Sequence, residues 1–281
     1  MELRELLQNI TPPDEAAREQ AHRRWAACAK PLGSLGLLET ALEDIAALTG
    51  DAQAPLLPRA VLVLCADNGV VAQGVTQTDS SVTAAVTRNL AAGRTSVCRM
   101  AQAAQCAVVP VDMGVRDFAP QPGVLARRIG NGTGDITQGP AMTRAQAEQA
   151  VLAGAELVRT QKEKGVRLLA TGEMGIGNTT TASAVASVLL GRAPVEMTGR
   201  TRGCGARWRP SSGPWPSAAP PRTTRWTFWP RWAALTSRGC AACFWAARPA
   251  VCLCWRTASS APWRRCARCG CARRRPRPFW R

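Results

Sequence analysis

A glycine-rich segment, TGEMGIGNTTT at residues 171–181, follows an apolar run and has the composition of a phosphate-binding turn. Glycines let a backbone come close to an anion, and the N–H groups in the first turn of a following helix attract negative charge. Asn178 and Thr179 are suitable N-caps that could also donate hydrogen bonds to phosphate oxygens. The spacing matches neither the dinucleotide fingerprint nor the lysine-containing P-loop, so NAD and ATP are poorly supported. The segment predicts a phosphate site; a glycine turn without a ligand is the alternative.

Glu173 lies inside this segment and qualifies the prediction. A carboxylate beside an anion site is electrostatically unfavourable unless it binds something else, such as the hydroxyls of a ribose. Glu173, Gly175, Gly177, Asn178 and Thr179 therefore favour a phosphorylated sugar or nucleotide as ligand.

Other candidate motifs carry weaker signals. GNGTGD at residues 130–135 and KPLGSLG at residues 30–36 each look like a simple turn when taken alone. His22 is the only histidine and lies beside two arginines on a charged helix face, which predicts a solvated side chain. No metal cluster and no Ser-His-Asp set can be assembled from residues 1–200.

The elements that must position these residues follow an alternating pattern. Three short apolar runs, at residues 60–66, 107–111 and 166–170, predict buried strands. Helical patterns cover residues 80–90, 95–105 and 143–164, which predicts an α/β fold with a parallel sheet flanked by helices in a Rossmann-like three-layer arrangement. Ligands bind at the carboxyl ends of such strands, so residues 67–69, 112–114 and 171–173 should share one rim.

The chain divides into three parts by composition. Residues 1–50 predict an N-terminal helical part, with one helix over residues 14–30 and a second, capped by Ser34, that runs to about Leu48 and ends at Gly50. Residues 51–200 form the expected α/β domain, and residues 201–281 a separate tail. The start of the chain lacks a signal-peptide pattern, and no run reaches the roughly 18 apolar residues of a membrane span. We therefore expect a cytoplasmic protein without a membrane partner. Residues 1–200 contain four widely spaced cysteines, which favours buried thiols over disulfides: Cys28, Cys65, Cys98 and Cys106.

Residues 201–281 contain no Asp, Glu, Lys, Asn, Gln, His or Tyr, the residues whose codons carry A at the second position. The same stretch holds nine of the ten Trp, eight of the twelve Cys and 17 of the 36 basic residues, all of them Arg. The whole excess charge of +17 therefore resides there, and residues 1–200 are formally neutral. A reading-frame slip in a GC-rich gene explains this bias, because the second position then falls on a former wobble base. We expect the last 80 or so residues to be non-native.

Taken together, residues 1–200 resemble the nicotinate-nucleotide:dimethylbenzimidazole phosphoribosyltransferase family of the cobalamin pathway. The similar segments, in family order, are KPLGSLG, VLVLCADNGV at residues 61–70, the strand end at residues 112–114, GTGD with GPAMTRAQA, and TGEMGIGNTTTASA. Two positions depart from the usual family pattern, since Asn68 replaces the histidine of ADHG and Leu32 replaces a proline. Neither removes a group that we assign to catalysis.

The resemblance implies transfer of a phosphoribosyl group from nicotinate mononucleotide to 5,6-dimethylbenzimidazole, without a redox cofactor or metal, by a homodimer. It places Glu173 at the ribose and Gly175, Gly177, Asn178 and Thr179 at the 5′-phosphate. It also implies that four residues face the benzimidazole: Thr78, Ser81, Val82 and Val86. The family's general base is a glutamate near the C-terminus, and residues 201–281 contain no acidic residue. The catalytic residue is therefore unknown in this chain, and we expect impaired activity.

The tail supports the frame-slip interpretation and limits the alternatives. Back-translated residues 224–247, regrouped one base earlier, permit the family segment DPLDVLAxVGGLDIAGMCGLFLGG. Frame-shifted codons also produce Cys and Trp freely, so the pairs Cys240-x-x-Cys243 and Cys266-x-x-Cys269 do not predict a zinc site. The alternative from another class is an α/β nucleotide-binding module with an Arg- and Trp-rich nucleic-acid-binding tail. A different enzyme that acts on a phosphorylated ligand is a third possibility.

Overall fold

A parallel five-stranded sheet in the order β3-β2-β1-β4-β5 organises the protein in this computed structural model, which describes residues 3–198 and 251–252 of the 281-residue chain. The predicted parallel sheet is thus confirmed. The strand bounds are β1 Arg59–Ala66, β2 Cys106–Gly114, β3 Leu125–Ala126, β4 Leu168–Met174 and β5 Val251–Cys252.

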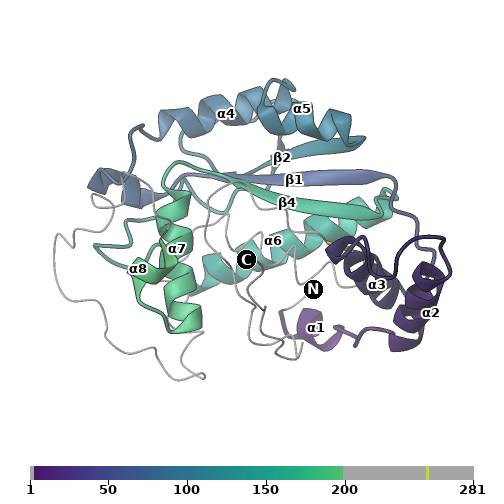
Figure 1. The fold of residues 1–281 in the computed structure, drawn as a ribbon. Coiled ribbons are helices and arrows are strands. Elements are labelled where there is room, and N and C mark those ends of the chain that lie inside the picture. Colours follow the sequence, from purple (N-terminus) through teal and green to yellow (C-terminus); the bar gives the residue numbers. More distant parts are fainter. Residues whose placement is uncertain (1–2, 199–250, 253–281) are drawn as a thin grey trace, which may run out of the picture.

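Helices cover both faces of the sheet, as expected for a three-layer α/β fold (Figure 1). α4 (Ser81–Ala91) and α5 (Ser96–Ala103) lie on one face, and α6 (Arg144–Glu163) lies on the other. Alternation along β1 supplies both cores: Leu62 and Leu64 pack with Leu157 of α6, whereas Val63 and Cys65 pack with Leu90 of α4. A strand that is apolar on both faces therefore fixes the position of helices on both sides.

The N-terminal helices lie at the opposite end of the sheet from α7 (Asn178–Leu190) and α8 (Pro194–Met197), near where the strands begin (Figure 1). They comprise α1 (Leu3–Gln8), α2 (Glu15–Ala26) and α3 (Leu37–Thr49). Asp14 caps α2 by accepting hydrogen bonds from the backbone N–H groups of Ala16 and Ala17 at 2.9 and 3.0 Å. Gly50 ends α3 in the left-handed conformation, as predicted.

Four details of the predicted elements are wrong. Ser34 is not the cap of α3, because the turn continues to Gly36, which takes that position without a side-chain cap. The third strand runs to Met174 rather than residue 170, because residues 171–173 pair with β1 despite their polar composition. Gly177 is the N-cap of α7, so Asn178 and Thr179 lie inside the helix. Cys28 is an exposed free thiol, whereas Cys65 is buried.

A short 3-10 helix, η1 (Gly69–Gln73), follows β1. Thr143 caps α6 in a reciprocal capping box with Gln146. In the part of the chain that is described, no helix is long and apolar enough to cross a membrane.

The single histidine allows a direct check of the packing of α2 on α3. Nδ1 of His22 lies 2.8 Å from Oε1 of Glu43, and this hydrogen bond raises the imidazole pKa above its ordinary value of about 6.5. The associated stabilisation is present below the unfolded-state pKa and is lost as pH rises through the folded-state pKa. We expect an NMR titration to give a raised pKa for His22 and an ordinary value in Glu43→Gln.

Glu163→Gln, at the C-terminal end of α6, serves as the control, because Glu163 pairs with Arg159, and it should leave the His22 titration unchanged. Equal His22 pKa values in the wild type and in Glu43→Gln would show that this contact between α2 and α3 does not form.

Candidate functional site

The three polar strand ends meet at one rim, as the sequence predicted. Parallel registration sets Asp112 of β2 opposite Cys65 of β1, and Glu173 of β4 opposite Leu64. The backbone N–H of Asp67 donates to the carbonyl of Gly114 at 3.1 Å, which joins the first two strand ends directly. The carboxyl ends of β1, β2 and β4 therefore build the candidate site.

The GNGTGD turn at residues 130–135, which looked like a simple loop, belongs to this rim. The N–H of Gly69 donates to the Thr133 hydroxyl, and the N–H of Thr133 donates to the Asp67 carbonyl, both at 3.1 Å. A Cβ on Gly69 would lie 2.4 Å from the carbonyl carbon of Gly134, closer than any side chain tolerates. This backbone contact explains the glycine at position 69.

Gly175 is required by packing at the end of β1. A Cβ at this position would lie 2.1 Å from the carbonyl oxygen of Ala66. Gly177 has φ +83°, a left-handed conformation that favours glycine, and it caps α7. The sequence attributed both glycines to the approach of an anion, and the structure gives each of them a conformational reason as well.

Glu173 and Asn178 lie together at the mouth of this turn. The Asn178 Nδ2 donates to Glu173 Oε1 at 3.2 Å, and both residues are half-buried. Thr179 is exposed in the first turn of α7. The structure thus brings the five residues predicted for phosphate and ribose binding to one place, with the carboxylate held beside the start of a helix.

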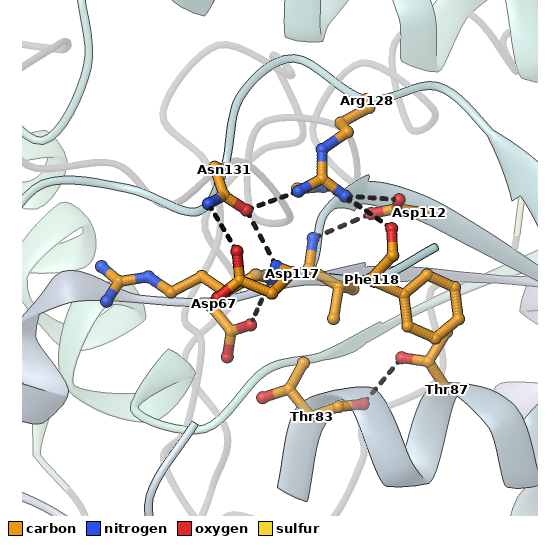
Figure 2. A network of polar contacts seen from close by, with 11 residues as sticks. Asp67, Thr83, Thr87, Asp112, Asp117, Phe118, Arg128 and Asn131 are labelled. Atoms are coloured by element: carbon orange, nitrogen blue, oxygen red, sulfur yellow. Dashed lines mark hydrogen bonds and ion pairs between the residues drawn. The ribbon is translucent and has the colours of Figure 1, made fainter. Parts of the chain in front are cut away.

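Asp67 is a buried carboxylate at the centre of the rim. Its Oδ2 accepts a hydrogen bond from the backbone N–H of Arg116 at 2.8 Å (Figure 2). Burial raises the Asp67 pKa, while the Arg116 N–H and the Thr83 hydroxyl oppose that rise by stabilising the charged form.

Asp112 anchors a second group of contacts, on the β2 side. Its Oδ1 accepts from the N–H groups of Gly114 and Val115 at 2.9 and 2.8 Å, and its Oδ2 pairs with Arg128 at 3.2 Å. Arg128 also donates to Asn131, whose side chain reaches Asp117 (Figure 2). These bonds tie the loop after β2 to the loop that precedes α6.

An open cavity of about 390 Å³ lies between the end of β1 and the start of α4. It is lined by Asn68, Gly69, Val71, Ala72, Asp79, Ser80, Ser81 and Arg116. Of the four residues predicted to face a base, Ser81 lines this cavity. Thr78 is exposed nearby and Val82 is half-buried, whereas Val86 packs against the core beneath α4.

Among the described residues, no group of three or more His, Cys, Asp or Glu side chains is arranged to hold a metal ion. The arrangement instead offers a helix start, a carboxylate and a cavity lined by polar and small residues. Such a set suits a phosphorylated, hydroxyl-bearing ligand.

A family model described as Phosphoribosyltransferase matches residues 10–208, which is most of the chain. The chain belongs to the nicotinate-nucleotide:dimethylbenzimidazole phosphoribosyltransferase family. It is 44% identical over 203 residues to the nicotinate-nucleotide–dimethylbenzimidazole phosphoribosyltransferase of Ruminiclostridium cellulolyticum, with 72% of this chain and 58% of the relative covered. The Escherichia coli protein of the same name is 39% identical over 198 residues, which cover 70% of this chain and 55% of the relative.

The crystal structure of the Thermus thermophilus enzyme named for the same reaction superposes with a TM-score of 0.71 at 35% identity. That match covers 83% of this chain and 71% of the Thermus chain. The family resemblance inferred from the motifs is thus confirmed. The chain spans little more than half the length of the curated relatives that it matches.

Sequence reasoning missed three residues of the rim: Thr83, Arg116 and Asn131. Thr83 and Thr87 are buried one turn apart on the side of α4 that also buries Leu90. A pair of threonines at positions where a sheet-packed helix normally carries apolar residues was the available signal.

The close contact at Gly175 can be tested by mutation. We expect Gly175→Ala to lower the free energy of unfolding by about 2 kcal/mol or more, because the new methyl group overlaps the Ala66 carbonyl. Gly139→Ala is the matched control, since nothing lies within 4 Å of its Cβ position, and its effect should stay within about 0.5 kcal/mol. Chemical denaturation of both variants measures the difference. Similar values would contradict the close approach of β4 to the end of β1.

Proposed function

We propose that the described part of the chain binds nicotinate mononucleotide for phosphoribosyl transfer to 5,6-dimethylbenzimidazole, giving α-ribazole 5′-phosphate and nicotinate. The observation that carries the proposal is the Glu173 carboxylate beside the glycine turn at the start of α7. Family membership and the printed names of the relatives support it.

Each site residue has a role in this proposal. The turn formed by Gly175, Gly177, Asn178 and Thr179 holds the 5′-phosphate, where the positive end of the α7 dipole favours an anion. Glu173 accepts hydrogen bonds from the ribose hydroxyls. The acceptor base lies near the start of α4, with Thr78, Ser81, Val82 and Val86 on its side. Ser81 and the cavity beside it give this placement its support.

The reaction is a displacement at the anomeric carbon. An azole nitrogen attacks C1′, the bond from C1′ to the pyridine nitrogen breaks, and that bond's electron pair leaves with nicotinate. The attacking azole loses its other N–H proton to a base. No electron is transferred to or from a cofactor in these steps, so the proposal includes neither a redox cofactor nor a metal.

The general base that the resemblance implies is missing from this sequence. The resemblance places that glutamate in the C-terminal part, and residues 201–281 carry no acidic side chain. The predicted frame slip lies outside the described residues. General-base assistance is typically worth about 10²–10⁴-fold in rate. We therefore propose that ligand binding survives here while turnover is largely lost.

We also propose a cytoplasmic homodimer for the family-type protein. The support is a run of exposed leucines at residues 32–38, in the turn before α3 and the first turn of α3, where Leu32 is 79% and Leu37 is 87% exposed. Closely spaced exposed leucines of this kind are typical of an association surface.

Binding of the nucleotide can be measured by calorimetry on the 281-residue chain. We expect nicotinate mononucleotide to bind more tightly than ribose 5-phosphate. Glu173→Gln should weaken nucleotide binding by about tenfold or more, because hydrogen bonds to a charged group are lost. Glu148→Gln, an exposed partner of Arg144 on α6, is the control and should bind as the wild type does. Absence of nucleotide binding by the wild type would overturn the proposed function.

The frame slip can be tested by resequencing the gene across the codons for residues 196–209 and by measuring turnover. We expect a single-base insertion or deletion there, and a frame-restored protein that forms α-ribazole 5′-phosphate at least about 100-fold faster than this chain. Liquid chromatography of the products measures both rates. An unchanged gene sequence, the intact mass of this chain and salt-dependent RNA binding by residues 201–281 would instead favour the nucleic-acid-binding alternative.

A further inference from the structure

The peptide groups on both sides of Ile176 are held by side chains from outside the glycine turn. Its backbone N–H donates to the Thr83 hydroxyl oxygen at 3.1 Å, and its carbonyl accepts from Asn68 Nδ2 at 3.0 Å. Thr83 comes from α4 and Asn68 follows the end of β1, so both side chains that hold Ile176 lie more than 90 positions before it in the sequence. Ile176 lies between Gly175 and Gly177, two residues without a side chain to limit the turn.

The side chains of Thr83 and Asn68 are both buried, so water does not compete for their hydrogen bonds to Ile176. Thr83 is 0% exposed and Asn68 is 1% exposed. The hydroxyl of Thr181, in α7, donates to Asn68 Oδ1 at 3.0 Å. The Ile176 carbonyl can only accept, so it fixes which end of the Asn68 amide is the donor, and the Thr181 hydroxyl satisfies the other end. An unpaired buried N–H or carbonyl would be costly, so the backbone has little freedom to turn away.

Thr83 also stabilises the charged form of Asp67. Because its oxygen accepts the Ile176 N–H, its own proton is available for the Asp67 carboxylate, whose pKa it lowers. Asp67 in turn accepts the N–H of Arg116 (Figure 2). The Thr83 hydroxyl therefore acts both on the turn and on the buried carboxylate at the end of β1.

We propose that Thr83 and Asn68 are positioning residues that hold the Gly175–Gly177 turn in the conformation needed to receive the phosphate of the nucleotide. This inference rests on the proposed function, since it concerns the same turn. Neither residue contacts the expected ligand positions through the atoms engaged here; each acts through the backbone of Ile176. A turn held in place before binding loses less conformational freedom when the ligand arrives, which strengthens binding.

Thr83→Val is the informative variant, because it keeps the shape of the side chain and removes the acceptor. Thr83→Ser keeps the hydroxyl and is the conservative rescue. Thr83→Ala provides a second loss variant that leaves space for water beside the N–H if the valine protein does not fold. Asn68→Ala removes the hydrogen bond to the Ile176 carbonyl and so tests the second contact.

Two measurements on the 281-residue chain separate positioning from general stability. Hydrogen exchange should be about tenfold faster at the Ile176 amide in Thr83→Val and Thr83→Ala, with the amides of β1 unchanged, and Thr83→Ser should stay within about twofold of wild type. Calorimetry with nicotinate mononucleotide should show about tenfold weaker binding for Thr83→Val, Thr83→Ala and Asn68→Ala, and near-wild-type binding for Thr83→Ser.

The proposal fails if Thr83→Ser loses as much as Thr83→Ala, or if exchange accelerates equally throughout the sheet, because either result indicates a purely structural role. It also fails if Ile176 exchange is unchanged in the loss variants. If the wild type binds no nucleotide, the proposed function fails, and the exchange comparison alone still decides whether these residues hold the turn.

Discussion

The contact between Gly175 and the end of β1 constrains the whole site. A Cβ there would lie 2.1 Å from the Ala66 carbonyl oxygen, so only glycine lets the chain leave β4 directly against its neighbouring strand. The register between the two strands sets where this happens, since Leu64 pairs with Glu173 and Cys65 with Met174. That exit brings the start of α7 onto the rim, and Gly177 then turns the chain into the helix. Glu173, the last polar residue before the turn, thereby stays next to Asn178.

Buried polar residues, rather than apolar packing, specify the geometry around this contact. Asp67, Asn68, Thr83 and Thr181 are all nearly inaccessible, in a region where most buried side chains would be hydrophobic. Burial of such groups is unfavourable unless each finds a partner, so the set tolerates few alternative arrangements. Burial raises the pKa of Asp67, and the Arg116 N–H and the Thr83 hydroxyl oppose that rise. Apolar cores hold the sheet together, and the polar rim fixes its loops.

The N-terminal helices and the proposed ligand site lie at opposite ends of the sheet. The N-terminal helices pack near the strand starts, where Glu39 binds Lys30 at 2.9 Å and accepts the N–H of Leu35 at the same distance (Figure 1). The proposed ligand site lies at the strand ends, formed by loops that a rigid scaffold positions. The exposed leucines lie in the turn before α3 and in its first turn, so the surface proposed for association belongs to a different segment from the rim.

The sequence by itself determined the elements and the family. Periodicity placed the strands and the long helices, because each pattern depends only on neighbouring residues. The segment at residues 171–181 is the most specific of the segments that indicated the family. The predicted roles of individual site residues, and of the tail, remain predictions. Only the tertiary structure decided the end of β4, since residues 171–173 look like a turn and become strand through pairing with β1. It also decided that the turn at residues 130–135 joins the rim and that Thr83 reaches Ile176. Those contacts join residues more than 60 positions apart, and local sequence patterns carry no information about such pairs.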